Sequence, residues 1–281
     1  MRRMLTVGLL GLVCLVLQAP LMPAKALLIA PSPIPDRVAN ASTIVLGKVT
    51  AIEDKPVKAS PSPGAAEVEY QIAVIQIDEA LLGAKGLTHL RVGFLPPAAG
   101  RPGGPIRRYP SVQLTKDQEV CLFLQPHASG SFLVAPMYFD LIDKKNPNFD
   151  KEVAQIRHCL KLLADPKASL QARNPKDRLT TASMLLARYR TVKGQPKQEP
   201  IDAGESKLIL KAIAEADWNA RPTTPGEATP QTLFYRLGLT PQDGWTPPKN
   251  AKELPDAMKK WLTDNADSYR ITRFVPETAE K

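Results

Sequence analysis

The sequence predicts an α+β protein in which a small five-stranded β-barrel precedes an all-α helical domain. Apolar residues recur at every second position between about residues 43 and 138, and at helical spacing after residue 150. The charge changes at the same place: residues 27–150 carry 12 basic and 12 acidic residues, whereas residues 151–281 carry 22 and 16. We therefore expect a barrel domain at 38–149, a helical domain at 150–275 and a tail at 276–281.

The first 26 residues have the features of a secretory signal peptide. Arg2 and Arg3 precede an uncharged run from Met4 to Leu17, and Ala24-Lys25-Ala26 is a small-x-small cleavage motif. The run is shorter than the roughly 20 apolar residues that a membrane-spanning helix requires. We expect cleavage after Ala26, a periplasmic or secreted protein, and no stable membrane span after cleavage.

The mature chain then begins with a Pro-rich lead-in at residues 27–37. Lipidation of Cys14 is disfavoured, because a lipobox requires a small residue where Val13 stands. Removal of the leader takes away three basic residues, which lowers the formal net charge from +9 to +6.

Five segments have the alternating or continuous apolar pattern of β-strands. Between Val74 and Ile75 the apolar positions shift by one residue, which predicts a β-bulge. The run "VCLFL" is apolar on both faces, as in a strand that is covered on both sides. The expected strands are Thr43–Ile52, Val68–Gly83, Leu90–Phe94, Val120–Leu124 and Ser131–Tyr138.

The stretches "STIVLGKVTAIED", "YQIAVIQIDEALLGAKG", "LRVGF" and "LTKDQEVCLFL" resemble the OB-like barrel shared by the tissue inhibitors of metalloproteinases and the netrin-type modules. They also resemble barrels of that kind in exported bacterial proteins of unknown function. The resemblance covers residues 38–142 and implies an OB-like barrel. Those inhibitors chelate the zinc of their target through an N-terminal Cys. The mature chain here starts at Leu27 with no Cys nearby, so that mechanism does not carry over.

Residues 95–112 stand where many OB barrels have a helix after the third strand. They contain five Pro and three Gly, which predicts a long loop. Four residues of this loop are candidates for binding: Arg101, Arg107, Arg108 and Tyr109. The loop is either a solvated connection or a basic and aromatic contact surface at the mouth of the barrel.

Five helices are expected in the second half. Asp150 is placed to cap the first, whose stripe is Val153, Ile156, Leu160 and Leu163. The others are expected to begin at Asn174-Pro175, at Asp202, at Thr229-Pro230 and at Pro255. All three Trp residues lie in this half, where they form either the core or an aromatic binding surface, and the core is favoured.

The sequence does not predict an enzyme or a cofactor. It has no GxSxG, HExxH, Walker or GxGxxG motif. His89, His127 and His158 are all expected at the surface, and Cys121 lies within a strand, where a buried thiol is inert.

Oxygen-bearing side chains gather in "DLIDKKNPNFD", where alternate ligands are typical of calcium loops. The calcium candidates are Asp140, Asp143, Asn146, Asn148 and Asp150. Two Lys residues within the run oppose a cation, and the turn Gly and final Glu are missing. The alternative is a polar connection between the two domains.

Cys121 and Cys159 are the two Cys residues of the mature chain, and they are a disulfide candidate in an oxidising compartment. We expect Cys159 at the edge of the apolar stripe of the first helix, where it would face Cys121 across the domain junction. Two separately buried thiols are the alternative.

These patterns favour an exported, non-catalytic interaction module. Its expected partner is another exported protein or an anionic envelope polymer, because the net charge is positive. Export and the neutral, aromatic-poor barrel do not favour nucleic acid as a partner. The alternatives are a protease inhibitor acting through barrel loops and a hydrolase whose residues are not recognised.

We expect the exported protein to begin at Leu27, because the leader ends in a cleavage motif after a short apolar run. Mass spectrometry of the exported protein measures this N-terminus. A chain that retains residues 1–26, or one that is lipidated on Cys14, would contradict the prediction.

Overall fold

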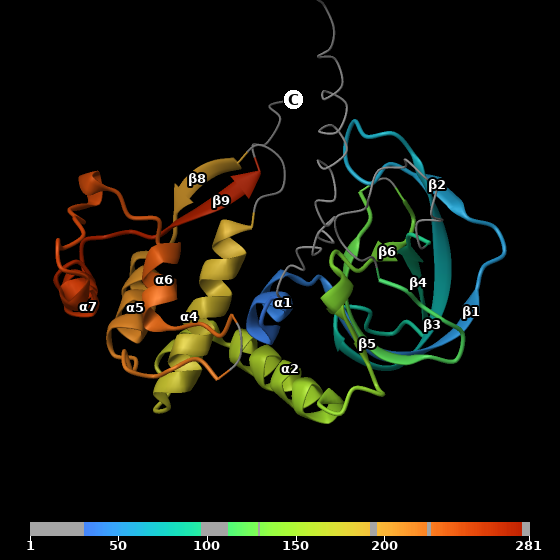
Figure 1. Ribbon diagram of the computed structural model, residues 1–281, viewed down its shortest axis with the longest axis horizontal. Helices are drawn as coiled ribbons and strands as arrows, with labels where there is room; N and C mark the ends of the chain where they lie inside the picture. Colours follow the sequence, from blue (N-terminus) through green and yellow to red (C-terminus); the bar gives the residue numbers. More distant parts are fainter. Residues whose placement is uncertain (1–30, 97–111, 129, 192–195, 224–225, 277–281) are drawn as a thin grey trace, which may run out of the picture.

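The computed structural model describes residues 31–96, 112–128, 130–191, 196–223 and 226–276. The protein is mixed α+β, with a ring-like sheet at one end, helices at the other, and α1 and α2 between them (Figure 1). Among the described residues, no helix has the length and apolar character needed to cross a membrane.

The sheet elements lie mainly in the first half of the chain. The strands are β1 (Thr43–Ile52), β2 (Val57–Ala59), β3 (Val68–Leu82), β4 (His89–Phe94), β5 (Glu119–Pro126), β6 (Leu133–Val134), β7 (Leu141–Asp143), β8 (Pro196–Pro200) and β9 (Thr272–Pro276). The α-helices are α1 (Ile34–Asn40), α2 (Phe149–Ala164), α3 (Pro166–Leu170), α4 (Pro175–Arg190), α5 (Ala203–Ala214), α6 (Pro230–Arg236) and α7 (Leu254–Asp264). The described residues also include the short 3-10 helices η1 (Tyr138–Asp140), η2 (Pro241–Asp243) and η3 (Ala251–Glu253).

Five strands form the ring in the order β1-β3-β4-β6-β5, and β5 pairs with β1 to complete it. Only β4 and β6 run parallel within the ring, and the other neighbours are antiparallel. The strands β2 and β7 attach to β3 and β5 respectively. The expected fifth strand, Ser131–Tyr138, is therefore too long, because only Leu133 and Val134 pair.

Strand β5 is covered on both faces, as the sequence predicted. Val120, Leu122 and Leu124 lie in the apolar cluster that fills the ring. Cys121 and Phe123, on the opposite face, pack with α1 and α2. All five residues are almost fully buried, which explains the uninterrupted apolar run.

The pairing of β1 and β3 is irregular at three places. Val49 pairs with Ile75 and Ala51 pairs with Val74, so Thr50 is the extra residue of a bulge. The irregularity is where the sequence predicted it, beside Val74 and Ile75, but the extra residue belongs to β1. Bulges increase the bend and twist of a strand pair, which helps the sheet to curve back on itself.

Residues 34–40 form helix α1, although the sequence predicted an irregular lead-in that ends at residue 37. The prediction treated the Pro residues as evidence against a helix. However, Pro33 is the N-cap residue and Pro35 lies in the first turn, where Pro is compatible with a helix. The helix packs with α4 and α2. The boundary expected at residue 38 falls within α1.

One apolar cluster, called the junction cluster here, joins the ring to the helices. It contains residues from α1, β1, β5, β7, α2 and α4: Ile34, Val38, Ala39, Ile44, Cys121, Phe123, Ile142, Val153, Ile156, Cys159, Leu162 and Met184. Because both halves of the chain contribute to it, the two halves share a core.

The buried stripe of helix α2 agrees with the predicted one only at Val153 and Ile156. Its N-cap residue is Asn148, and Asp150 lies in the first turn. Its buried residues are Val153, Ile156, Cys159 and Leu162. Leu160 and Leu163 are only half-buried, so Cys159 lies within the buried stripe and not at its edge.

The remaining helices surround a second core. The side chains of Asn174, Asp202 and Thr229 accept the backbone hydrogen bonds that begin α4, α5 and α6, as predicted. Trp245 and Trp261 are buried against Phe234, which confirms the core interpretation for these two residues, and Trp218 is half-buried against the same core. The second half is not all-α, however, because β8 and β9 form a two-stranded sheet. Their segments "PKQEP" and "TRFVP" lack the apolar alternation that identifies strands.

We expect Leu162→Ala to lower the free energy of unfolding by about 2–5 kcal/mol, because it opens a cavity in the junction cluster. The matched control is Leu160→Ala, the same change at a half-buried position of the same helix. Its cost should be clearly smaller, and urea unfolding measures both. Equal costs, or a larger cost at Leu160, would show that the predicted stripe and not the observed one is buried.

Candidate functional site

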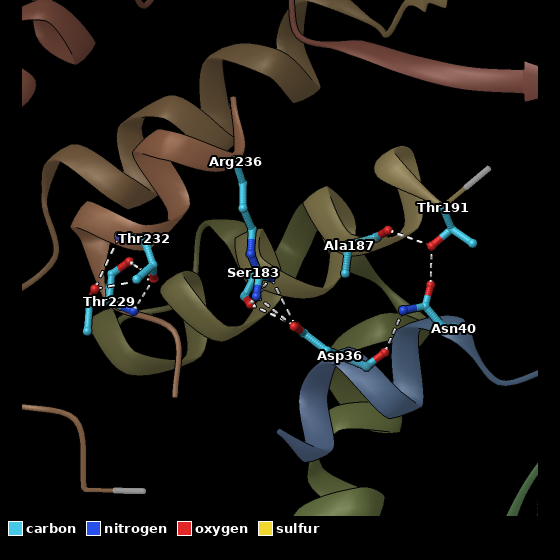
Figure 2. A network of polar contacts seen from close by, with 8 residues as sticks. All are labelled: Asp36, Asn40, Ser183, Ala187, Thr191, Thr229, Thr232 and Arg236. Carbon is cyan, nitrogen blue, oxygen red and sulfur yellow. Dashed lines mark hydrogen bonds and ion pairs between the residues drawn. The ribbon is translucent and has the colours of Figure 1, made fainter. Parts of the chain in front are cut away.

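Helix α1 carries two adjacent charged residues that contact different parts of the protein. Asp36 faces the helical half, where Nη1 and Nη2 of Arg236 lie 3.1 and 2.7 Å from its two carboxylate oxygens. The Ser183 hydroxyl lies 3.3 Å from the same carboxylate, and Figure 2 shows these groups pointing toward one another. Arg37 faces the ring. The short helix is thus held by charge on both sides.

Further polar contacts hold the C-terminal end of α1 against α4. The Thr191 hydroxyl donates to the Asn40 side chain, whose amide donates to the Asp36 carbonyl oxygen (Figure 2). Arg188 donates through Nε to the carbonyl oxygen of Ala39 at 3.0 Å. These contacts position α1, and therefore Arg37, beside β5.

Arg37 and Asp140 form a buried ion pair with side chains only 7% and 10% exposed. Nε of Arg37 donates to Oδ1 of Asp140 over a long distance, 3.4 Å, whereas Oδ2 accepts from the backbone N–H of Met137 at 2.9 Å. The guanidinium lies over the Phe123 ring, 4.1 Å from its centroid, and 5.9 Å from the centroid of Phe139. Its Nη2 is buried and has no hydrogen-bond partner among the described residues.

Burial dominates the electrostatics of this pair. Burial lowers the pKa of Arg37, and attraction to Asp140 only partly opposes this effect. Burial likewise raises the pKa of Asp140 above its usual value, against the opposing effect of Arg37. Both groups are therefore shifted toward their neutral forms, which means that each charge is incompletely compensated.

A pocket of about 230 Å³ opens beside the pair. Arg37 and Asp140 form a polar part of its lining, and the side chains of Phe123, Phe139 and Met137 form an apolar part. Met137 is 41% exposed, which is unusual for a large apolar residue in this protein. The pocket thus combines a buried guanidinium with an apolar wall that reaches the surface.

Most of the calcium candidates form contacts with other residues of the protein. Asp140 pairs with Arg37, so it is not available to a loop cation. Asp143 accepts from Gln118 at 2.6 Å and from the backbone of Lys145 at 2.8 Å. Asn146 accepts from the backbone of Asn148, and Asp150 is an exposed residue of α2. These contacts fit the alternative of a polar connection, and no group of metal-binding His, Cys, Asp or Glu side chains occurs among the described residues.

The two Cys residues show no disulfide, and both are free thiols buried in the junction cluster. Burial raises the pKa of Cys121 and that of Cys159 to about 12. Since the thiolate is the reactive form, neither thiol is activated as a nucleophile in this structure.

The three His residues differ in their surroundings. His89 and His158 are exposed as predicted, and Nε2 of His158 lies 2.9 Å from Oδ1 of Asp177. The prediction for His127 is wrong, because its side chain is buried between Tyr70 and Phe132, with ring centroids 4.9 and 4.6 Å away. Burial lowers its pKa.

The candidate loop residues Arg101, Arg107, Arg108 and Tyr109 lie outside the described residues. Sequence reasoning missed the pocket itself. One signal was present in "IPDRVAN", where Arg37 follows Ile34 by three residues and precedes Val38, which places a cation in an apolar stripe. The Pro residues before it hid the helix.

No protein-family model matches the chain, and a search of curated proteins finds no match. Among the described residues, the pocket beside Arg37 combines a buried cation with an apolar wall, which makes it a candidate ligand site.

We expect the stability gap between wild type and Asp140→Asn to change with pH. Because burial raises the pKa of Asp140 above that of the unfolded chain, the folded protein takes up this proton first as the pH falls. The wild type should therefore gain stability relative to Asp140→Asn as the pH decreases from about 7 toward about 4. Urea unfolding of both proteins across this range measures the gap.

The control for this experiment is Asp150→Asn, which removes an exposed carboxylate from the first turn of α2. Any effect of the control reports on the end of that helix and not on the buried pair. A wild type that loses stability relative to Asp140→Asn as the pH falls would contradict the dominance of burial at Asp140.

Proposed function

We propose that the protein is an exported, non-catalytic interaction module, and that the pocket beside Arg37 is where it binds another exported protein or envelope component. One observation carries this proposal: Arg37, whose buried Nη2 has no hydrogen-bond partner among the described residues, lines a pocket that has an apolar wall. A buried charge with unused donors is costly unless something compensates it. A partner that supplies an acceptor would remove part of that cost.

The groups at the pocket suit recognition better than catalysis. Arg37 presents a planar set of donors, which favours binding over proton transfer. Asp140 is engaged by Arg37 and by the backbone of Met137. These fixed contacts support a role in positioning a bound group.

We further propose that the ring-like sheet is an OB-like barrel of the kind found in the tissue inhibitors of metalloproteinases and netrin-type modules. The OB-fold is a five-stranded, partly open Greek-key barrel. In support, the first ring strand, β1, pairs with both β3 and β5, and β4 runs parallel to β6. The Arg37 pocket lies on the outer face of β5.

Export is proposed from the leader, residues 1–26, which lie outside the described residues. A mature net charge of +6 favours partners with negative charge in the periplasm or outside the cell. Both the leader and the charge are consistent with an envelope partner.

We expect Met137→Glu to abolish partner capture, because it places a negative charge at the exposed edge of the pocket. It leaves the backbone N–H that donates to Asp140 in place. The mature protein is immobilised and exposed to the envelope fraction of its own source, and retained proteins are compared by mass spectrometry.

The matched control is Leu87→Glu, the same kind of change at a large apolar residue that is 54% exposed. Leu87 lies in the turn between β3 and β4 and does not line the pocket. Partners retained by wild type and Leu87→Glu but lost with Met137→Glu support the proposal. Loss with neither variant, or turnover of a hydrolase substrate by the purified protein, contradicts it.

A further inference from the structure

The guanidinium of Arg37 has more donors than the protein uses. A guanidinium carries five N–H donors in a fixed plane. Its one hydrogen bond in the described structure is the 3.4 Å contact from Nε to Asp140, and Nη2 is buried without a partner. A planar group with two oxygens matches this arrangement best, because a guanidinium binds carboxylates through two parallel hydrogen bonds.

The volume of the pocket limits what it can hold. The pocket has a volume of about 230 Å³. It is smaller than the roughly 300–1,000 Å³ of sites for drug-sized ligands. The pocket therefore suits a terminal group with one small apolar substituent.

The wall of the pocket defines the rest of the ligand. Phe123 and Phe139 flank the guanidinium, and Met137 adds a flexible apolar side chain that is partly exposed. An aliphatic body against these side chains would bury apolar surface, which favours binding by about 25 cal/mol per Å². A strongly polar or highly charged ligand would lose solvation there without compensation.

We propose that the pocket binds a free carboxylate carried by a small aliphatic body, with Arg37 as the residue that receives the carboxylate. The proposal rests on the proposed binding function of this site and names its ligand chemistry. The carboxylate is either the C-terminus of a partner chain or that of a free short aliphatic acid.

The acidic residues near Arg37 leave room for such an anion. The negative charge of Asp36 is paired with Arg236, which donates two hydrogen bonds to its carboxylate. Asp140 is the carboxylate closest to the guanidinium, and its own second oxygen is held by the Met137 backbone. The more distant Glu152 of α2 also affects Arg37. Two direct hydrogen bonds to the guanidinium are therefore needed to outweigh repulsion from Asp140.

The test uses three probes with the mature, folded protein. They are the pentapeptide GGSAV with a free C-terminal carboxylate, the same peptide with a C-terminal amide, and 3-methylbutanoate. Isothermal titration calorimetry measures the affinities, and the NMR signal of the Arg37 Nε–H reports whether the guanidinium is contacted. We expect the free-acid peptide to bind at least about tenfold more tightly than the amide, because charge-assisted hydrogen bonds are lost in the amide.

Two variants locate the binding. Arg37→Lys keeps a positive charge but removes the planar guanidinium. We expect it to lower the affinity for the two free-acid probes to that for the amide peptide. Met137→Glu should also lower the affinity for the free-acid probes, whereas Leu87→Glu should bind them with the affinity of the wild type. If Arg37→Lys does not fold, two other results still test the proposal. They are the affinities of the wild type for the acid and amide peptides, and the effect of Met137→Glu on the binding of the free-acid probes.

Each outcome has a defined meaning. Tighter binding of the peptide than of 3-methylbutanoate identifies a chain end, and equal or tighter binding of 3-methylbutanoate identifies a free acid. Equal affinity for acid and amide overturns the carboxylate proposal, as does absence of binding by both acids. If capture from the envelope fraction still depends on Met137 in that case, only the ligand chemistry is wrong. If that capture also fails, the proposed function fails with it.

Discussion

The burial of helix α1 between the sheet and the helices is the constraint on which the rest of the structure depends. A helix of seven residues is too short to be stable alone, so tertiary contacts must hold it. Its apolar side chains enter the junction cluster, Asp36 binds Arg236 of the helical half, and Arg37 binds Asp140 beside the ring. The seven residues of α1, which precede both the ring strands and the helical half in the chain, thus connect these two parts.

Placing a guanidinium in this junction has a structural cost and a functional consequence. An apolar side chain of similar size would fill the same space without desolvating a charge. Arg37 instead binds η1 through Asp140, and this contact places Phe139 and Met137 beside the pocket. The remaining donors of Arg37 are what give the pocket a chemical preference. A stabilising contact and the proposed binding site therefore share one side chain.

The site was harder to predict than the fold, for a reason that Asp140 illustrates. The sequence grouped Asp140 with its neighbours as a calcium candidate, but its partner, Arg37, lies 103 residues earlier in the chain. Short-range patterns reveal which residues could bind an ion, but they do not reveal which residue far away in the sequence pairs with them in the folded protein. Likewise, Cys159 and Cys121 were expected near the junction and lie there, yet the structure keeps them as separate thiols in an apolar cluster.

The sequence alone determined those features that arise from contacts between near neighbours. It predicted that strand β5 is covered on both faces, that an irregularity lies beside Val74, and that α4, α5 and α6 begin at capping residues. It assigned the bulge to the wrong strand, because the extra residue lies in β1. Alternation and capping are local properties of the chain. Only the tertiary structure decided which face of α2 is buried, that α1 is a helix, and that β8 pairs with β9. These features depend on surfaces that distant segments provide, and their local propensities are too weak to specify them.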